Sequence, residues 1–410
     1  MKIPKILIIN GEPFNDITAT GITLTKLFKN YGEDSILYMY SANIAASAEI
    51  DVKYLKLSNK DLFKNQNLSF NKINKKLKIN DGHSSSGAKN SEFKKKISGA
   101  LDLFTYSISE HTIEEIRNFN PTLIYSNLGS NRIINLCSSL GRELNIPIVP
   151  HFLDDWLSIP NVYSFSFINY LLFRNINKNI VKLISNSKHG FCIGPEMKSE
   201  YEERFKIKFS CMMNPVEKIL EDKKLLSSDV KKIVFMGGLH LGRLEALVEF
   251  LKELENANLI YEIEIHLYVA ASYREKILEH NIKGLKIIVH DYVSPSEVET
   301  ELLKYDVGLH LESFDDRLKK FTRLSISTKI PQYMGLGLPI LAYSPSDVSS
   351  TKYIELNRAG VVVDNDLEDK IKLIFDEYDF FSHNAVNVAK RSHSSELQFQ
   401  QMLSVFNEVS

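Results

Sequence analysis

The sequence has few cysteines and no long apolar run. Its 410 residues include three cysteines, Cys137, Cys192 and Cys211, and no two of them have the spacing of a metal site. An odd, sparse set argues against a disulfide framework and fits a reducing cytoplasm. The apolar run at 6–9 is too short for a signal-peptide core, and no stretch approaches the roughly 20 apolar residues of a spanning helix. We therefore expect a cytoplasmic protein that does not cross a membrane.

Charge of one sign and metal-binding clusters are lacking as well. The formal net charge is −1, so no global field points to nucleic acid as a partner. The sequence has no His/Cys cluster with zinc spacing, no G-x-S-x-G string and no P-loop. The D-x-D string at 364–366 precedes a helical pattern, and we expect it to cap that helix. These absences predict that no metal and no cofactor is required.

What the sequence does contain is an alternation of short apolar runs and helical patterns. The runs are rich in Ile and Val and nearly continuous, which is typical of parallel strands buried on both faces. They cover residues 6–9, 35–40, 122–125, 146–152, 183–185, 233–236, 263–269, 285–289, 307–311, 340–343 and 361–363. Between them, segments such as 243–255 and 294–304 carry the 3.6-residue period of crossover helices. The alternation occurs twice, which predicts an α/β protein with two Rossmann-like, doubly wound domains facing a cleft.

A polar stretch near 213–232 marks the break between the two halves. We expect a first domain over 1–212 and a second over 213–391. The last segment, 392–410, has the pattern of a helix, and it either packs locally or crosses back to brace the first domain.

Residues 56–98 interrupt the alternation of apolar runs and helical patterns. They contain eleven lysines and only three acidic residues, Asp61, Asp81 and Glu92. The composition favours a solvated, flexible insertion. The alternative is a basic patch that contacts anionic lipid or a lipid-linked acceptor, which would place the protein peripherally at the inner face of the membrane.

Four loops carry candidate functional residues. In the first, KKIVFMGGLHLGRLEALVEFL at 231–251, a strand ends at Gly237 and Gly238 and a helix begins near Arg243. Glycines let the backbone approach a ligand, a helix N-terminus favours anions, and Arg243 adds a forked cation suited to phosphate oxygens. The alternative is a glycine turn that serves only tight packing.

The second loop lies in FTRLSISTKIPQYMGLGLPILAYSP at 321–345. A helix is expected from Lys329 to about Gly335, with Ser327 and Thr328 at its start and Gln332 one turn further on. A lysine is unusual near the positive end of a helix unless an anion lies there. The alternative is a solvated lysine beside an ordinary loop.

The third loop, IPIVPHFLDDWLSIPN at 146–161, places His151, Asp154, Asp155 and Trp156 at the end of a strand. Ligands of open α/β sheets gather at such ends. Either aspartate is a candidate for receiving the acceptor proton or holding sugar hydroxyls, and the sequence does not decide which. The alternative for His151 is a hydrogen-bonded core residue.

The fourth loop follows the first strand, in NGEPFNDITATGITLTKLFKNYG. It is long for a strand-to-helix link, and Asp16, Thr20 and Gly21 are its candidate ligand-binding residues. The alternative is a surface loop with a capping threonine.

The first two motifs resemble the donor half of GT-B-fold glycosyltransferases, especially glycosyltransferase family 4 with its retaining bacterial polysaccharide and glycolipid enzymes. The resemblance covers the whole chain and is strongest in 231–245 and 325–364. It implies a donor site formed by Gly237, Gly238, Arg243, Ser327, Thr328, Lys329 and Gln332. It also implies catalytic roles for His151, Asp154, Asp155, Arg243 and Lys329, and an acceptor site near Asp16, Thr20 and Gly21.

The sequence departs from the family pattern at the usual pair of glutamates, which fall on Leu324 and Gln332. Gln332 can hydrogen-bond a ribose hydroxyl but carries no charge. The usual Arg–Lys pair of the first turn falls on Gly238 and Arg243, so one cation is missing there and we expect Lys329 to replace it.

The resemblance implies a hexosyltransferase of class EC 2.4 in bacterial cell-surface polysaccharide biosynthesis. It would move a sugar from a nucleotide diphosphate donor to a glycan or lipid-linked acceptor, with retention and without a metal. Two alternatives remain open. One is a sugar-nucleotide epimerase of the same fold, and the other is a catalytically silent glycosyltransferase-like binding or chaperone subunit.

Overall fold

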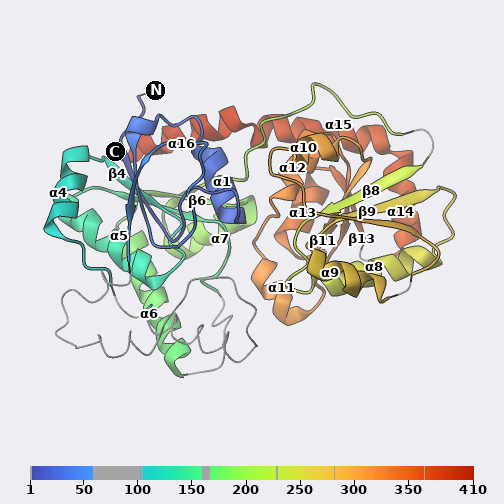
Figure 1. Cartoon of the computed structure of the whole chain (residues 1–410), viewed down its shortest axis with the longest axis horizontal. Helices are drawn as coiled ribbons and strands as arrows, with labels where there is room; N and C mark the ends of the chain where they lie inside the picture. Colours follow the sequence, from blue (N-terminus) through green and yellow to red (C-terminus); the bar gives the residue numbers. More distant parts are fainter. Residues whose placement is uncertain are drawn as a thin grey trace. The chain divides into compact units, whose positions relative to one another are not determined.

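The computed structural model describes residues 2–58, 102, 105–158, 167–227, 230–280, 282–363 and 365–410. The predicted basic insertion at 56–98 lies outside these residues except for its first three positions. The chain forms two compact units (Figure 1). The first comprises Met1–Cys192, Lys198–Cys211 and Gln401–Ser410, and the second comprises Ile193–Met197 and Met212–Gln400.

The first unit contains a parallel sheet, in the order β3-β2-β1-β4-β5-β6-β7 among the described residues. Its strands are β1 (Ile6–Asn10), β2 (Ile36–Tyr40), β3 (Lys53–Lys56), β4 (Leu123–Ser126), β5 (Ile148–Phe152), β6 (His189–Cys192) and β7 (Lys208–Cys211). β1 pairs with β2 from Ile6↔Ile36 and with β4 from Ile6↔Leu123. All five residues of β1 are buried, as expected for a central strand covered on both faces.

Three of the helices of the first unit begin at a polar capping residue. The helices are α1 (Ala19–Phe28), α4 (Glu110–Phe119), α5 (Asn131–Leu144), α6 (Phe167–Ile184) and α7 (Pro195–Phe205). The hydroxyls of Ser109 and Ser130 accept hydrogen bonds from the first turns of α4 and α5. Asn120 and Asn145 end these two helices in the left-handed conformation that asparagine tolerates.

One of the expected strands is absent from the structure. Residues 183–185 do not form a strand, because Leu183 and Ile184 are the buried end of α6. The strand in this part of the sheet is β6, which begins five residues after Ile184. A short apolar run has the same appearance at the end of an amphipathic helix and in a buried strand, which explains the error.

An aromatic cluster joins the C-terminus of the chain to the first unit. The ring of Phe406, on α16 (Ser395–Val409), lies 6.0 Å from the rings of Tyr125 and Phe191 and 6.1 Å from that of Tyr31. Phe406 is fully buried, and Asn407 donates a hydrogen bond to the carbonyl of Lys2. The end of α16 is therefore part of the core of the first unit.

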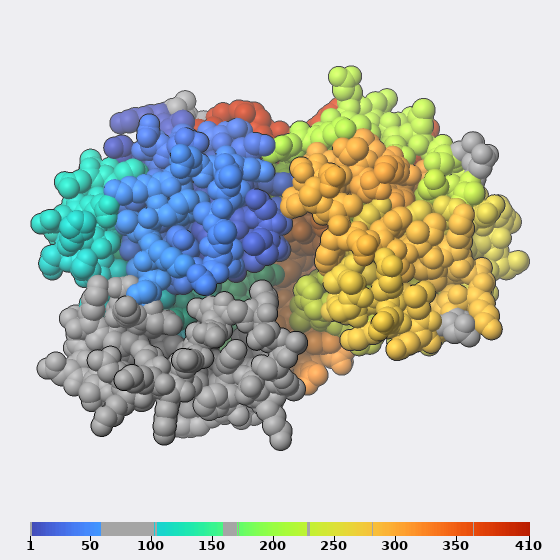
Figure 2. Space-filling model, in the orientation of Figure 1, coloured from blue at the N-terminus to red at the C-terminus, as the bar shows by residue number. Residues whose placement is uncertain are grey.

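The second unit also contains a parallel sheet, in the order β10-β9-β8-β11-β12-β13. Its strands are β8 (Lys231–Met236), β9 (Ile263–Tyr268), β10 (Lys286–His290), β11 (Val307–Leu311), β12 (Ile340–Tyr343) and β13 (Gly360–Val363). Together with the first sheet, it confirms the predicted α/β class with two parallel sheets. In the space-filling view, the visible surface of this unit is mostly yellow to orange, the colours of the segment that contains α9, β10 and α11 (Figure 2).

Helices cover both faces of the second sheet. They are α8 (Arg243–Asn256), α9 (Ala271–Leu278), α10 (Val298–Leu302), α11 (Asp316–Thr322), α12 (Lys329–Gly335), α13 (Ser349–Leu356), α14 (Leu367–Asp376) and α15 (Tyr378–Val388), followed by a π-helical turn at Ala389–His393. Residues of α8, α9 and α14 share one apolar core with alternate residues of the strands. On the other face, α12 approaches β11 so closely that a Cβ at Gly308 would lie 2.5 Å from the ring of Tyr333.

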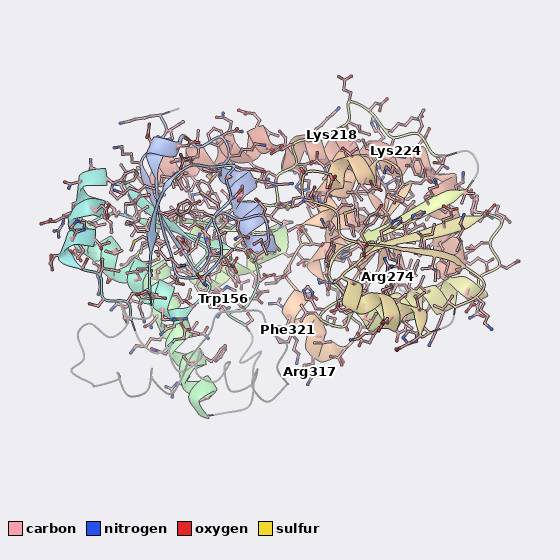
Figure 3. All side chains as sticks on the ribbon, in the orientation of Figure 1. Trp156, Lys218, Lys224, Arg274, Arg317 and Phe321 are labelled. Atoms are coloured by element: carbon pink, nitrogen blue, oxygen red, sulfur yellow. The ribbon has the colours of Figure 1, made fainter. Side chains whose placement is uncertain are left out.

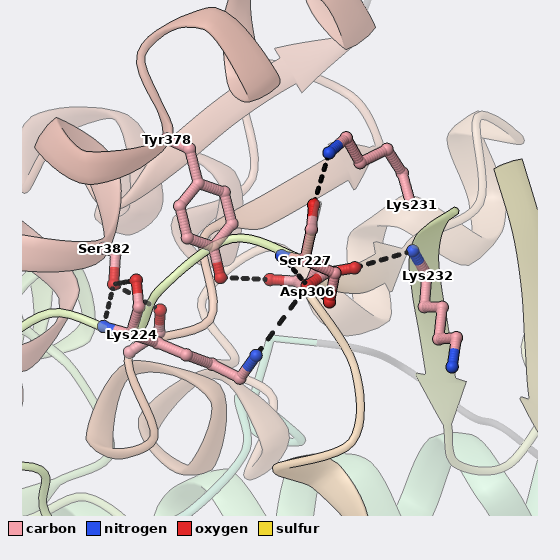
Figure 4. Close-up of polar contacts among 8 residues, drawn as sticks. Lys224, Ser227, Lys231, Lys232, Asp306, Tyr378 and Ser382 are labelled. Atoms are coloured by element: carbon pink, nitrogen blue, oxygen red, sulfur yellow. Dashed lines mark hydrogen bonds and ion pairs between the residues drawn. The ribbon is translucent and has the colours of Figure 1, made fainter. Parts of the chain in front are cut away.

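A buried carboxylate fixes the segment that leads into β8. Asp306 is fully buried and accepts hydrogen bonds from the backbone and hydroxyl of Ser227 and from the backbone N–H of Lys232 (Figure 4). The ammonium of Lys224 lies 3.8 Å from the same carboxylate, and Tyr378 donates to the Asp306 carbonyl. Burial lowers the pKa of Lys224, and Asp306 opposes that shift. Asp306 therefore holds together a polar network that no sequence motif indicated.

Two buried histidines are neutral in the fold. Nε2 of His310, on β11, lies 3.0 Å from the hydroxyl of Ser350, and Nε2 of His393 lies 2.9 Å from that of Tyr353. Burial, followed by the nearby charges of Arg243 and Arg391 respectively, lowers the pKa of each to about 3. Since an unfolded histidine has a pKa of about 6.5, the unfolded chain binds more protons than the fold between these two values.

We expect Asp306→Ala to lower the free energy of unfolding by about 3 kcal/mol, because the change leaves buried donors and a cation without their acceptor. Urea denaturation followed by circular dichroism measures the effect. Asp316→Ala is the matched control, since the Asp316 side chain is 93% exposed and forms a surface ion pair with Lys319. Equal stability of the two variants would contradict the role given to Asp306.

The histidines predict a loss of stability in mild acid. Their contribution is complete above about pH 6.5 and declines as the pH falls towards 3, so each costs about 2 kcal/mol at pH 5. Urea unfolding at pH 7.5 and pH 5.0 measures this change. His393→Gln keeps an amide near Tyr353 but does not titrate, so its stability should fall less steeply. A parallel pH dependence in the variant and the parent would rule out His393 as a contributor.

Candidate functional site

Each sheet has one topological switch point, where the connections leave in opposite directions. In the second unit it lies between β8 and β11, and in the first unit between β1 and β4. Ligands of open parallel sheets bind outside the carboxyl ends of the strands at such points. The loops that follow these four strands are therefore where a site is expected.

The turn after β8 is a close-packed connection that requires glycine at one position. Gly242, the residue before α8, has φ +76°, and a Cβ there would lie 2.4 Å from the hydroxyl oxygen of Ser313. Only glycine adopts this conformation without strain and also allows the loop after β11 to approach so closely. Gly237 and Gly238, which the sequence singled out, lie earlier in the same turn. Gly237 donates a hydrogen bond to the carbonyl of Tyr268.

Arg243 joins the turn after β8 to the end of β11. Its Nε donates to the carbonyl of Leu311 at 3.1 Å, and its Nη2 donates to Oε1 of Glu312 at 2.7 Å. The Arg243 side chain is 18% exposed and that of Glu312 only 3%. The guanidinium is thus a partly buried cation with a carboxylate partner, and its positive charge is largely neutralised within the unit. Glu312 was not among the residues predicted from the sequence, since no spacing rule connects it to Arg243.

Lys329 is the first residue of α12, as the sequence predicted, and its side chain is half-buried. The backbone N–H of Lys329 donates to the hydroxyl of Ser327, and Asn214 donates to the carbonyl of Thr328. α12 lies between β11 and β12 in the chain, and these strands are parallel neighbours. Its first residue therefore lies towards the carboxyl ends of the strands, the same edge as Arg243 and Glu312.

Gln332, one turn after Lys329, contains a buried oxygen without a partner. The side chain is 6% exposed, and its Oε1 has no hydrogen-bond partner among the residues that the structure describes. An unsatisfied buried acceptor is costly, so the position calls for a donor such as a hydroxyl. Leu324, the other position that departs from the family pattern, is buried in the core and carries no polar group.

The switch point of the first unit is bridged by two asparagines. Oδ1 of Asn10 accepts a hydrogen bond from the backbone N–H of Asn127 at 2.8 Å, and Nδ2 of Asn10 donates to the hydroxyl of Tyr38. The following residue, Leu128, is buried with φ +62°, a strained conformation for a non-glycine residue. Oδ1 of Asn127 is buried and has no hydrogen-bond partner in the described part of the chain. These residues were missed because asparagine after a strand is also common in ordinary turns.

The N-terminal loop is held by its own side chains. Oδ1 of Asn15 accepts from the backbone of Ile17 and Thr18, and the Thr18 hydroxyl caps α1 by accepting from Gly21. A Cβ at Gly21 would lie 2.0 Å from the Asn15 side chain, so this glycine serves close packing. Asp16, also predicted, is exposed and accepts from the hydroxyl of Ser47. Thr20 is half-buried in the first turn of α1.

His151 lies inside the core of the first unit. Its side chain is fully buried, and Nδ1 is 2.5 Å from the hydroxyl of Tyr125. Its ring packs against those of Tyr125 and Phe191. This is the environment of a hydrogen-bonded core histidine, the second of the two interpretations that the sequence allowed.

The two adjacent aspartates have different surroundings. Asp155 is fully buried, and Oδ1 accepts hydrogen bonds from the hydroxyls of Tyr201 and Ser158, both at 2.8 Å. Asp154 is exposed, and Trp156, labelled in Figure 3, is half-buried beside them. Asp155 therefore fixes the loop after β5, and Asp154 is the carboxylate that faces solvent.

Within the described residues, no group of three or more His, Cys, Asp or Glu side chains is arranged to hold a metal ion. Over the same residues, none of the helices combines the length and apolar character that crossing a bilayer needs.

Solved structures with the same architecture are glycosyltransferases. HepE from Anabaena, in complex with UDP and glucose, matches with a TM-score of 0.62 and 11% identity over 98% of this chain and 100% of its own. A glycosyltransferase from Rickettsia africae matches with a TM-score of 0.61 and 13% identity over 99% and 98%. The lipopolysaccharide outer core galactosyltransferase WaaB matches with a TM-score of 0.56 and 11% identity over 98% and 99%. No family model and no curated protein matches the sequence. The structural neighbours show that the chain has the GT-B fold.

Arg243→Ala should lower the free energy of unfolding by about 3 kcal/mol, because it removes the cation that faces the buried Glu312 carboxylate. The double variant Arg243→Met/Glu312→Leu replaces both charges by apolar groups and should recover most of that loss. Urea denaturation of the parent, the single and the double variant measures both effects. A single variant as stable as the parent would show that the ion pair does not hold this turn.

Proposed function

We propose that the protein is a glycosyltransferase that transfers a hexose-type sugar from a nucleotide diphosphate donor to a glycan or lipid-linked acceptor. The proposal rests on two side chains that lie one turn apart on α12. One is the cation of Lys329, and the other is Gln332, whose buried Oε1 has no hydrogen-bond partner among the described residues. A donor of this class presents a diphosphate to a cation and ribose or sugar hydroxyls to an acceptor oxygen. The GT-B fold, shared over nearly the whole chain with glycosyltransferases, adds independent support.

Lys329 is the principal cation of the proposed donor site. Departure of a nucleoside diphosphate builds negative charge on the bridging oxygen, and a fixed cation stabilises that charge. Two unit charges 4 Å apart interact by about 4 kcal/mol at an effective dielectric of 20. Since about 1.4 kcal/mol corresponds to a tenfold change in rate, losing this cation would slow transfer by orders of magnitude.

Arg243 has a second role in this proposal. Its guanidinium donates to Glu312 and to the Leu311 carbonyl, so much of its positive charge is neutralised within the unit. It holds the glycine turn of Gly237 and Gly238 against the end of β11, where backbone N–H groups can meet the diphosphate. Ser327 and Thr328 contribute hydroxyls beside Lys329, and Gln332 accepts a hydroxyl of the donor.

The acceptor is proposed to bind at the switch point of the first unit. The unsatisfied Oδ1 of Asn127 calls for a hydroxyl donor, which a glycan supplies. Asp154 is the exposed carboxylate of the loop after β5 and is the candidate for receiving the acceptor proton. Asp16 and Thr20 flank the same edge through the loop after β1, whereas Asp155, Gly21 and His151 support these loops from within.

Retention, independence of metal and a role in bacterial cell-surface polysaccharide synthesis complete the proposal, by analogy with the family resemblance alone. A peripheral membrane contact through residues 56–98 is also proposed, but almost all of that segment lies outside the described residues.

A catalytically silent nucleotide-binding subunit is the second candidate. The buried state of His151 and Asp155 favours it, as does Gln332 in the place of a glutamate. Such a protein would bind a nucleoside diphosphate at Lys329 and transfer no sugar. An epimerase would instead release a changed nucleotide sugar without any acceptor.

Lys329→Ala should weaken binding of nucleoside diphosphates at least thirtyfold, because it removes the cation of the diphosphate site. Isothermal titration calorimetry with UDP, GDP and ADP measures the affinity, and assays with the matching nucleotide sugars measure transfer. Thermal unfolding should be unchanged, because the Lys329 side chain is only half-buried at the edge of the sheet.

Lys320→Ala is the matched control, since it removes an exposed lysine from the neighbouring α11. It should bind and turn over as the parent does. Near-normal binding and transfer by a folded Lys329→Ala protein would remove this residue from the mechanism. Tight binding without turnover by the parent would favour the silent subunit.

A further inference from the structure

One long helix of the first unit has an unusual charge composition. α6 (Phe167–Ile184), drawn in green in Figure 1, contains the basic residues Arg174, Lys178 and Lys182 and no acidic residue in its 18 positions. The whole chain, by contrast, is balanced, with 50 basic and 51 acidic residues. The positive charge of α6 is therefore a local feature, not a consequence of overall composition.

The basic residues of α6 lie on one exposed face. Tyr170, Arg174, Lys178 and Lys182 follow one another at intervals of four, which places them along one side of a helix over about 18 Å. All four are exposed, Tyr170 by 56%, and Val181 beside them is exposed by 54%. We call these five residues the α6 stripe.

The opposite face of α6 is fixed to the unit. Leu172, Ile180 and Leu183 are buried, and α6 packs against α5. Asn179 donates a hydrogen bond to the side chain of Asn131, the first residue of α5. The stripe is therefore held outward by a packed helix and cannot turn its charges inward.

Within the described part of the chain, no carboxylate neutralises the charges of the stripe. Among the residues that the structure describes, Arg174, Lys178 and Lys182 form no ion pair. The guanidinium of Arg174 lies 5.8 Å from the centre of the Tyr170 ring, a cation–π contact that keeps its charge at the surface. Arg204, also exposed, donates to Asn177 of α6 and adds a fourth cation nearby.

We propose that the α6 stripe is a docking surface for a bilayer that carries anionic lipid headgroups. Cations along one side of a helix match an anionic plane, and exposed Tyr and Val side chains between them can enter the boundary between headgroups and acyl chains. Duplex nucleic acid, whose bases are paired and stacked, would contact the cations and leave Tyr170 and Val181 without a role. The stripe lies on the first unit and is distinct from the donor site proposed on the second.

The test is vesicle flotation of the full-length protein, with no measurement of activity. Vesicles of phosphatidylcholine alone are compared with vesicles containing one quarter phosphatidylglycerol. Each cation close to an anionic surface strengthens binding about fivefold, so Arg174→Glu/Lys178→Glu/Lys182→Glu should weaken partitioning onto the anionic vesicles at least a hundredfold. Binding of the parent should also fall steeply between low salt and physiological salt.

The matched control is Lys252→Glu/Lys283→Glu/Lys372→Glu, which makes the same change in net charge at three exposed lysines of the second unit. It should float as the parent does. Tyr170→Ser/Val181→Ser should weaken binding several-fold while leaving the salt dependence unchanged. Circular dichroism and thermal unfolding confirm that each variant is folded.

Equal flotation of the α6 variant and the control, or no flotation of the parent, would overturn the proposal. So would a parent that binds duplex DNA through the stripe and ignores anionic vesicles. None of these results depends on nucleotide binding. A negative flotation result would therefore not contradict the proposed donor site, and normal nucleotide binding by Lys329→Ala would not contradict the docking surface.

Discussion

The ion pair between Arg243 and Glu312 is the interaction on which the switch point of the second unit depends. β8 and β11 are adjacent parallel strands, and the chain leaves their carboxyl ends in opposite directions. The pair ties the turn after β8 to the end of β11 within the low-dielectric edge of the sheet, where a lone charge would be costly. Gly242 makes the approach possible, because any side chain at that position would collide with Ser313. The backbone that could meet an anion is thus rigid before any ligand arrives.

Different interactions connect the loops at the switch points of the two units. In the first unit, Asn10 at the end of β1 accepts a neutral hydrogen bond from the backbone N–H of Asn127, which follows β4. In the second unit, an ion pair joins the turn after β8 to the end of β11. The neutral bridge leaves an amide oxygen that calls for hydroxyl donors. The ionic bridge largely neutralises Arg243, and Lys329 lies at the same edge of the sheet. This difference in chemistry fits one site for a polyhydroxyl ligand and another for an anionic one.

Periodicity was sufficient to predict the fold class, because strands buried on both faces leave a continuous apolar run. It missed two strands that have exposed residues, and it mistook one buried helix end for a strand. β3 and β7 contain exposed lysines, and the end of α6 has the apolar run of a strand. The start of α12 at Lys329 was predicted correctly, since Pro331 and Gly337 limit where that helix can lie. Glu312, Asn127 and Asp306 could not be predicted, because their importance comes from contacts across 69, 117 and 79 positions of sequence. The burial of His151 could not be decided either, since its partner Tyr125 lies on another strand.

A crystal structure of the protein with a bound nucleoside diphosphate would show whether the second sheet carries a donor site. We expect the diphosphate to lie at the carboxyl edge of that sheet, within hydrogen-bond distance of the Lys329 ammonium, with a ribose or sugar hydroxyl donating to Gln332. The Arg243–Glu312 pair should remain intact beside it. A diphosphate bound on another surface, with Lys329 and Gln332 left untouched, would contradict the account.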